Sequence, residues 1–253
     1  MIPRLVLAVL LLAGAARGEE RVVAALSQTE VAITTNFEGT RILVFGAVKR
    51  AAPEPEGPPL EVIVTIASPR EPVVVRRKSR RAGIWVNAEA VTVDAAPGFY
   101  AIATTGPLFE VISHTEDLRW NVSVERMIRS VGAPMDILDS QSFSDALIRI
   151  RERSGHYVLR EGAVRLREGT LFDTAITLPA DVSEGTYTAR IFLTRGRRVI
   201  DSFETGIDVR MVGLERVTFN LARQQPLLYG LLAVALAVLA GWAAAAFTAW
   251  RRG

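Results

Sequence analysis

The longest uninterrupted hydrophobic stretch in the chain runs from Leu227 to Trp250. Its sequence, LLYGLLAVALAVLAGWAAAAFTAW, contains no charged residue, and Arg223 and Arg251 lie beyond its two ends. As a helix rising about 1.5 Å per residue it would extend roughly 36 Å, enough to cross a hydrocarbon core of about 30 Å. A buried helix of a soluble protein is the alternative, but such helices rarely run for about seven turns without a polar face. The pattern therefore predicts a transmembrane helix over residues 227–250.

A second apolar stretch, residues 1–18, has the pattern of a secretory signal peptide. Arg4 gives it a positive start, Leu5–Leu12 form a short hydrophobic segment, and small residues follow that would allow cleavage after Ala15, Ala16 or Gly18. The apolar run is short for a membrane span, although an uncleaved signal anchor is the alternative. In both cases we expect the chain that follows to be exported.

The two apolar segments together predict how the chain is oriented across the membrane. The body of the chain would lie on the outer side of the membrane, and the tail, residues 251–253, would stay in the cytoplasm. Arg251 and Arg252 would then satisfy the positive-inside rule.

Between the two apolar segments, alternating apolar and polar residues predict short β-strands, each closed by Gly or Pro. Strands at about ten-residue spacing are typical of a β-sandwich. The expected strands are Glu30–Thr34, Arg41–Phe45, Leu60–Ala67, Pro72–Arg81, Ile84–Asp94, Phe99–Thr105, Ala163–Arg167, Leu171–Leu178, Gly185–Thr194 and Val199–Val209.

The strand pattern is interrupted between residues 114 and 156. Ser144 could cap a helix that runs through Arg153 and stops at Gly155, with Leu147, Ile148 and Ile150 packing inward. Residues 115–129 hold a weaker helical pattern.

Two strands are preceded by the same order of residues, Gly and then Tyr, at Gly98–Tyr100 and Gly185–Tyr187. In immunoglobulin-like sandwiches a Tyr in this place makes a corner hydrogen bond to upstream backbone, so the repeat suggests two related sandwiches. The predicted fold is all-β, an immunoglobulin-like β-sandwich region with a short helical insertion and one C-terminal transmembrane helix. The expected division is 1–18 signal peptide, 19–113 first sandwich, 114–156 helical connector, 157–213 second β-rich domain, 214–226 linker, 227–250 membrane helix and 251–253 tail.

Composition narrows the function classes. The sequence has no cysteine, which excludes disulfides, thiol catalysis and Cys-ligated zinc. The pI near 9.7 is misleading, because four of the thirty basic residues (Arg4, Arg17, Arg251 and Arg252) belong to targeting and anchoring. The remaining 26 face 27 acidic residues, so no general attraction to nucleic acid is expected.

One concentrated basic cluster lies within Arg70–Arg81, which has six basic residues and one acid. As a strand, it would place Arg77 and Arg81 on one face and Arg76, Lys78 and Arg80 on the other. A solvated hairpin end or a charged edge strand explains this pattern without a ligand. The functional alternatives are an anion site built from guanidinium groups, or a contact with anionic lipid headgroups.

The membrane helix carries small residues at every fourth position: Ala233, Ala237, Gly241, Ala245 and Ala249. Such a stripe lets another helix approach closely, although an alanine-rich segment produces it by chance as well. We expect the stripe to be a packing surface for another membrane protein.

No catalytic or metal-binding motif is recognisable. His114 and His156 lie 42 residues apart without the spacing of a metal site, and loop or surface histidines explain them. Nucleophile elbows, Ser-x-x-Lys pairs and phosphate loops are absent from the sequence. We expect no enzyme, no metal and no cofactor, while a hydrolase built from residues distant in sequence stays an alternative.

Several short motifs occur together in an order that resembles the alphaproteobacterial putative transmembrane protein family. The resemblance covers nearly all of the mature chain and implies a bacterial inner-membrane protein with a periplasmic body. Members of the family that the chain resembles are often encoded beside a sulfite-exporter-type permease, which suggests such a permease as a partner by association only. The resemblance supplies no catalytic residue. The motifs are Ile33–Gly39, Phe45–Ala47, Gly83–Asn87, Phe99–Ala101, Leu108, Leu178–Ala180, Gly185–Tyr187, Leu228–Gly230 and Gly241–Trp242.

Together these observations predict a single-pass inner-membrane protein that acts as a non-enzymatic accessory or scaffold for another membrane protein. The alternative is a periplasmic anion-binding module that uses the cluster Arg76–Arg81.

Overall fold

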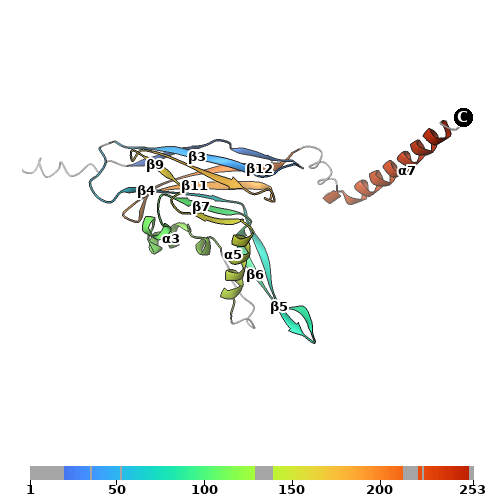
Figure 1. The fold of residues 1–253 in the computed structure, drawn as a ribbon, viewed down its shortest axis with the longest axis horizontal. Helices are drawn as coiled ribbons and strands as arrows, with labels where there is room; N and C mark the ends of the chain where they lie inside the picture. The colour runs from blue at the N-terminus through green and yellow to red at the C-terminus, as the bar shows by residue number, and fades with distance from the viewer. Residues whose placement is uncertain are drawn as a thin grey trace, which may run out of the picture.

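Two β-sheets face each other across the main hydrophobic core, and short helices cover the outer face of one of them (Figure 1). The computed structural model describes residues 20–34, 36–51, 53–128, 139–212, 222–223 and 225–250, with side chains of the last helix up to Ala244. The signal peptide expected over residues 1–18 lies outside the described residues, as does the tail, 251–253.

The smaller sheet has four antiparallel strands in the order β1-β3-β10-β9. The larger sheet has six strands in the order β2-β12-β11-β4-β7-β8, in which the β2–β12 and β7–β8 pairs are parallel. The strands of the smaller sheet are β1 (Arg21–Leu26), β3 (Thr40–Lys49), β9 (Arg165–Arg167) and β10 (Leu171–Leu178). Those of the larger sheet are β2 (Glu30–Ile33), β4 (Leu60–Ala67), β7 (Tyr100–Thr104), β8 (Tyr157–Arg160), β11 (Gly185–Arg195) and β12 (Arg198–Met211).

The strand order corrects the expected division into two sandwiches. Strands from residues 19–113 pair with strands from residues 157–213 in both sheets, and both ranges contribute to one core. Alternation along a strand reports which face is buried but not which partner it pairs with, so the division could not be read from the pattern. The all-β fold with one C-terminal apolar helix is confirmed.

β4 is buried on both faces because it lies between two cores. Its residues Leu60, Val62, Val64 and Ile66 face the smaller sheet, and Ile63 faces the helical layer. That layer consists of α2 (Leu108–Val111), α3 (His114–Trp120) and α4 (Val124–Met127). The near-continuous apolar sequence of β4 is what a strand without a solvated face requires.

The helix expected from Ser144 is present but begins earlier. α5 runs over Gln141–Arg153, and Ser144 is buried within it. Phe143 is buried as well, whereas Ile150, expected to face inward, is exposed. The weaker pattern over 115–129 is two helices, α3 and α4, separated where Asn121 adopts a left-handed conformation with φ of 51°.

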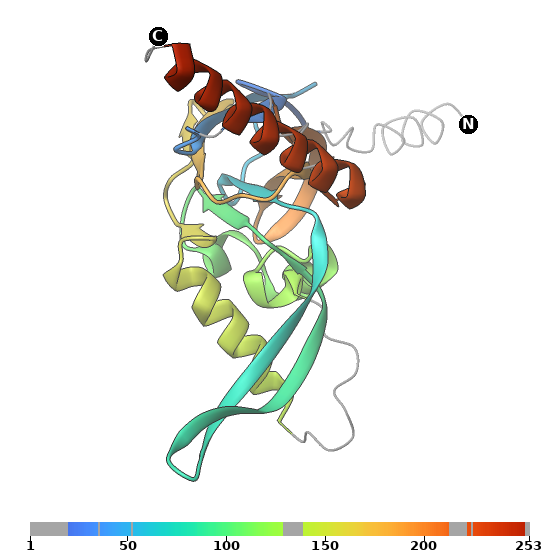
Figure 2. The same cartoon turned by 90° about the vertical axis from the view of Figure 1, so that its right-hand side faces the viewer.

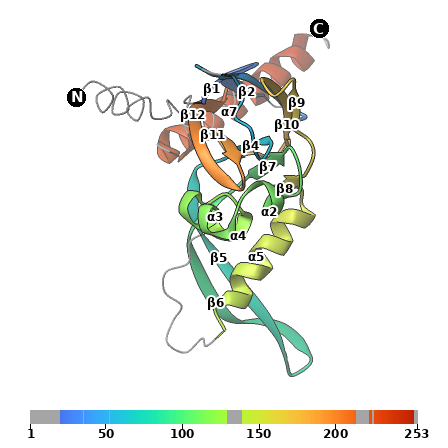
Figure 3. The same ribbon diagram turned by 90° about the vertical axis from the view of Figure 1, so that its left-hand side faces the viewer.

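A two-stranded hairpin extends away from the sandwich and past the end of α5 (Figures 2 and 3). It consists of β5 (Arg70–Arg81) and β6 (Ile84–Pro97). Leu147 of α5 packs with Val73, Val75, Val93 and Ala96 near the base of the hairpin. The base is therefore part of the body, while the distal half projects from it.

The two Gly–Tyr segments have different roles. The Tyr187 hydroxyl donates to the Ser183 carbonyl 2.9 Å away, which is the expected corner hydrogen bond. The Tyr100 hydroxyl instead donates 2.6 Å to the carbonyl of Val122, downstream in the helical layer, so the prediction is wrong at this position. Burial raises the pKa of Tyr100 to about 12, and its phenol is therefore neutral at physiological pH.

α7 (Pro226–Trp250) is the expected membrane helix. Over Pro226–Ala244 its mean hydropathy is 2.2 and none of that segment is buried against the body. Within the described residues it is the one helix long and apolar enough to span a membrane.

Candidate functional site

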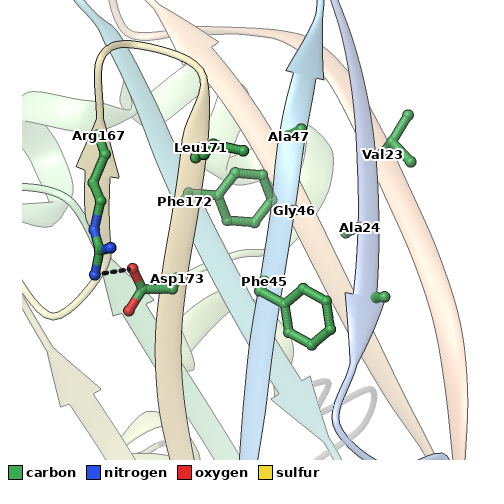
Figure 4. Close-up of a pocket in the computed structure, with 10 residues that line it drawn as sticks. Val23, Ala24, Phe45, Gly46, Ala47, Arg167, Leu171, Phe172 and Asp173 are labelled. Atoms are coloured by element: carbon green, nitrogen blue, oxygen red, sulfur yellow. Dashed lines mark ion pairs between the residues drawn. The ribbon is translucent and has the colours of Figure 1, made fainter.

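An open groove with a cavity volume of about 440 Å³ lies on the outer face of the smaller sheet (Figure 4). Alternate residues of three strands point outward here, and Val23, Phe45 and Leu171 are 57%, 47% and 57% exposed. Leu43, on the same face of β3, is 48% exposed. A contiguous apolar surface on the solvent side of a sheet is typical of a binding site.

The floor of the groove depends on Gly46. The buried ring of Phe172 packs against this glycine from the core side. A Cβ on Gly46 would be 2.5 Å from Phe172 Cζ and 2.5 Å from the carbonyl oxygen of Val23. A strand glycine at such a place permits a close approach that any side chain would prevent. Gly46 thus lets Phe172 fill the core beneath the groove.

One rim of the groove is charged. Asp173 of β10 forms an ion pair with Arg167 at 3.1 Å (Figure 4). It forms a second with Arg165 at 2.7 Å, and both arginines come from β9. Both arginine side chains are largely exposed and Asp173 is half-buried, so the pairs add little stability and provide a polar border. An apolar floor beside a polar rim is the composition of a protein-binding patch.

The basic cluster predicted from the sequence lies on the distal half of β5. Arg76, Arg77 and Lys78 all line a second cavity of about 440 Å³ between the hairpin and α5. Asp145 and Arg149 of α5 line the same cavity. Strict alternation would have divided the three residues of β5 between two faces, but the strand register shifts between Arg77 and Lys78. Arg80 and Arg81 lie further out, beside the turn.

Arg77 has a structural role in this cavity. Its guanidinium forms ion pairs with Glu89 at 3.1 Å and Asp139 at 3.2 Å, and lies 4.5 Å from the ring centroid of Phe143. A hydrogen bond from Ser142, aided by the charge of Arg77, holds the pKa of the Asp139 carboxyl below its usual value. Arg77 therefore fastens the hairpin to α5, and the cavity's other basic side chains are Arg76, Lys78 and Arg149.

The structure also brings together a serine, a histidine and an aspartate that sequence reasoning treated separately. His156 lies in the bend between α5 and β8, as expected of a loop histidine, but it is buried rather than on the surface, and its Nδ1 lies 2.8 Å from Ser154 Oγ. Its Nε2 lies 3.3 Å from Asp181 Oδ2. The Ser154 hydroxyl, however, donates 3.0 Å to the Arg151 carbonyl at the end of α5. A nucleophilic serine would instead direct this proton at the histidine, so the arrangement here is that of a helix end fixed to the sandwich.

Within the described ranges, the structure shows no group of three His, Asp or Glu side chains placed to hold a metal ion. His114 is exposed, and its ring stacks on Phe109 with centroids 4.5 Å apart.

A family model described as "Putative transmembrane protein (Alph_Pro_TM)" matches residues 21–249. The chain belongs to this family. The match confirms the resemblance found in the sequence and, with α7, identifies an integral membrane protein with one spanning helix among its described residues.

Other comparisons add little to the family assignment. No curated protein matches the chain. A solved structure of Spo0M, the sporulation control protein of Bacillus subtilis, shares 10% identity with a TM-score of 0.29. The alignment covers 82% of this chain and 56% of that protein, and a TM-score this low carries no argument about fold or function.

In this member of the family, the small-residue stripe of the anchor is open to its surroundings. Ala233, Ala237 and Gly241 are exposed on α7, and nothing lies within 4 Å of a Cβ built on Gly241. Ala245 and Ala249 fall in the part of the helix whose side chains are not described. The stripe is therefore not covered by the described part of the body.

The groove could not be predicted from the sequence, because β10 lies more than a hundred positions after β1 and β3. The one available signal was an apolar residue on the outward face of each strand, such as Phe45 next to buried Val44. A single exposed apolar residue is ordinary and indicates no site.

Proposed function

We propose that this membrane protein is a non-enzymatic accessory or scaffold whose body docks on another integral membrane protein from the periplasmic side of the inner membrane. The observation that carries the proposal is the apolar groove formed by Val23, Phe45 and Leu171. Monomeric soluble domains rarely leave such a surface open, and the anchor keeps this one beside other membrane proteins. The occupant we propose is an apolar segment of that partner, and a permease of the sulfite-exporter type is the candidate suggested by the sequence resemblance.

The anchor supports the same proposal. In lipid, helices associate through close van der Waals contact, which small side chains permit. Docking by the groove and by α7 would reinforce each other, because the first contact raises the effective concentration for the second.

The test uses a photoreactive amino acid at position 45 in native membranes. We expect a crosslink to one integral membrane protein, whereas the same probe at Ile200, an exposed apolar residue of β12 outside the groove, should give none. Gly241→Leu or Ala237→Leu should reduce the crosslink at position 45 several-fold without preventing membrane insertion. Ala235→Leu and Ala243→Leu, which lie off the stripe, are the matched controls. Equal crosslinking from positions 45 and 200, or equal behaviour of the four helix variants, would contradict the proposal.

A second candidate function is anion binding in the cavity between the hairpin and α5, favoured by the convergence of Arg76, Lys78 and Arg149. If it is correct, titration of the purified protein with sulfite, sulfate and phosphate will give saturable binding. Arg76→Gln combined with Lys78→Gln should then weaken the affinity at least about tenfold, because hydrogen bonds to charged groups are worth about 1.5–3 kcal/mol each. Absence of saturation with all three anions would eliminate this candidate.

A further inference from the structure

The tip of the β5–β6 hairpin exposes two large apolar side chains far from either core. Ile84 is 64% exposed and Trp85 is 67% exposed. They follow the turn at Ala82 and Gly83, whose φ angles of 48° and 86° match the two-residue turn that suits a twisted hairpin. Neither side chain belongs to the cluster that α5 forms with the hairpin base.

Positive charge surrounds these apolar side chains. Arg81 pairs across the turn with Ile84, and Arg80 pairs with Trp85. From Arg76 to Ala88 the sequence contains five basic residues and no acid. An exposed tryptophan among arginines is the composition of a surface that lies at a membrane interface, because the ring prefers the headgroup level and guanidinium groups bind anionic headgroups.

The anchor keeps the hairpin close to such a surface. Residues 212–225 connect β12 to α7, and even a fully extended chain of that length spans only about 50 Å. β5 has 12 residues and is therefore about 40 Å long, of which the distal half, roughly 20 Å, projects from the body. The anchor thus keeps the body near the membrane, and the projecting tip can contact that surface without contact by the rest of the body.

From this geometry we infer that the hairpin tip is a second membrane contact, in which Ile84 and Trp85 enter the interface and Arg80 and Arg81 bind anionic lipid headgroups. The contact requires neither the proposed partner nor the apolar groove. It would hold the body in one orientation on the membrane, which attachment through α7 alone does not do.

The chain has no cysteine, so a single introduced cysteine can be labelled without removing others. An environment-sensitive fluorophore on Ile84→Cys is measured in the full-length protein in nanodiscs that contain nitroxide-labelled lipid. We expect lipid quenching in discs rich in phosphatidylglycerol and much less in phosphatidylcholine discs. The same label on Leu43→Cys, on the outer face of the sandwich, should stay unquenched.

Charge variants separate recognition of lipid from insertion driven by the label. Each basic residue near an anionic surface changes the binding equilibrium about fivefold, so Arg80→Gln with Arg81→Gln should lower the ratio of docked to free hairpin about 25-fold. Arg153→Gln with Arg160→Gln removes the same charge at exposed positions elsewhere and should have little effect. An unquenched label in anionic discs, as expected if the tip binds a protein or a second copy instead, would overturn the inference. Quenching that is equal in both lipids and unchanged by the double substitution Arg80→Gln with Arg81→Gln would overturn the assignment to anionic headgroups.

Discussion

Glu20→Gln is expected to lower the free energy of unfolding of the body by about 3 kcal/mol, because it removes the central anion of a buried ion-pair network. Glu20 accepts a hydrogen bond from Arg50 at 2.6 Å and two from Arg195 at 3.2 Å and 2.9 Å. Both arginines also bind backbone carbonyls, of Gly169 and Pro58 respectively, so they cannot move out to solvent freely. Chemical unfolding of the protein in detergent micelles, monitored by near-ultraviolet circular dichroism, measures the change.

Glu54 provides the control, since it contacts the same two arginines at 3.4 Å and 3.3 Å but its side chain is 44% exposed. Glu54→Gln should cost less than about 1 kcal/mol. Equal losses from the two substitutions would contradict the assignment of Glu20 as the centre of the network.

The same network predicts a pH dependence. Burial alone would raise the pKa of Glu20, but hydrogen bonds and charges from Arg195 and Arg50 outweigh it, and the pKa is lowered. A lowered folded-state pKa gives stability that is present above the ordinary glutamate value of about 4.3 and is lost as the pH falls through the folded value. Below pH 4.3 the wild type should therefore lose its advantage over Glu20→Gln, and the two unfolding curves should converge.

Gly46→Val is expected to have a comparable effect, a loss of about 3 kcal/mol, by forcing apart elements that meet at the floor of the groove. The new side chain would meet the ring of Phe172, which can shift only into a filled core, and the backbone of Val23, which cannot shift without breaking the β1–β3 pairing. Ala47→Ser, at the next residue but on the outward face, should change stability by less than about 0.5 kcal/mol. Hydrogen exchange of the β1 amides gives the decisive measurement, because faster exchange there is specific to the expected displacement. Wild-type protection of β1 in Gly46→Val would contradict this mechanism.

Local elements of the fold could be predicted from the sequence wherever the cause is local. β4 and β10 occur at the predicted residues, since period-two alternation and closing Gly or Pro residues act within a few positions. The predicted cap of α5, Ser144, lies four residues after the actual N-cap, Ser140, because Ser144 has the chemistry of a helix cap but is buried within the helix.

Features that depend on long-range pairing could not be predicted. Leu171 lies opposite Ala47, and Val23 lies on the other side of the same strand, yet nothing in their local sequences indicates that they share one groove. The partner of Tyr100 is the carbonyl of Val122 between α3 and α4, which the sequence alone could not place next to β7. Of the candidate residues, the basic cluster was found because its members are consecutive, whereas the role of Arg77 as a fastening to α5 required the structure.

The mixing of early and late strands in both sheets also determines when this protein can fold during its synthesis. The smaller sheet cannot be completed until β10 has been synthesised, and the six-stranded sheet is incomplete until β12 ends at Met211. Pairing over such sequence separations is slow, because loop closure has to precede the contacts that stabilise it. The apolar face of β4 therefore stays uncovered until late in synthesis, and exposed apolar surface of this kind favours aggregation until it is covered. The body can close only once β12 has been made, and α7 follows β12 after residues 212–225, so completion of the sandwich and insertion of the anchor become closely spaced steps of biogenesis.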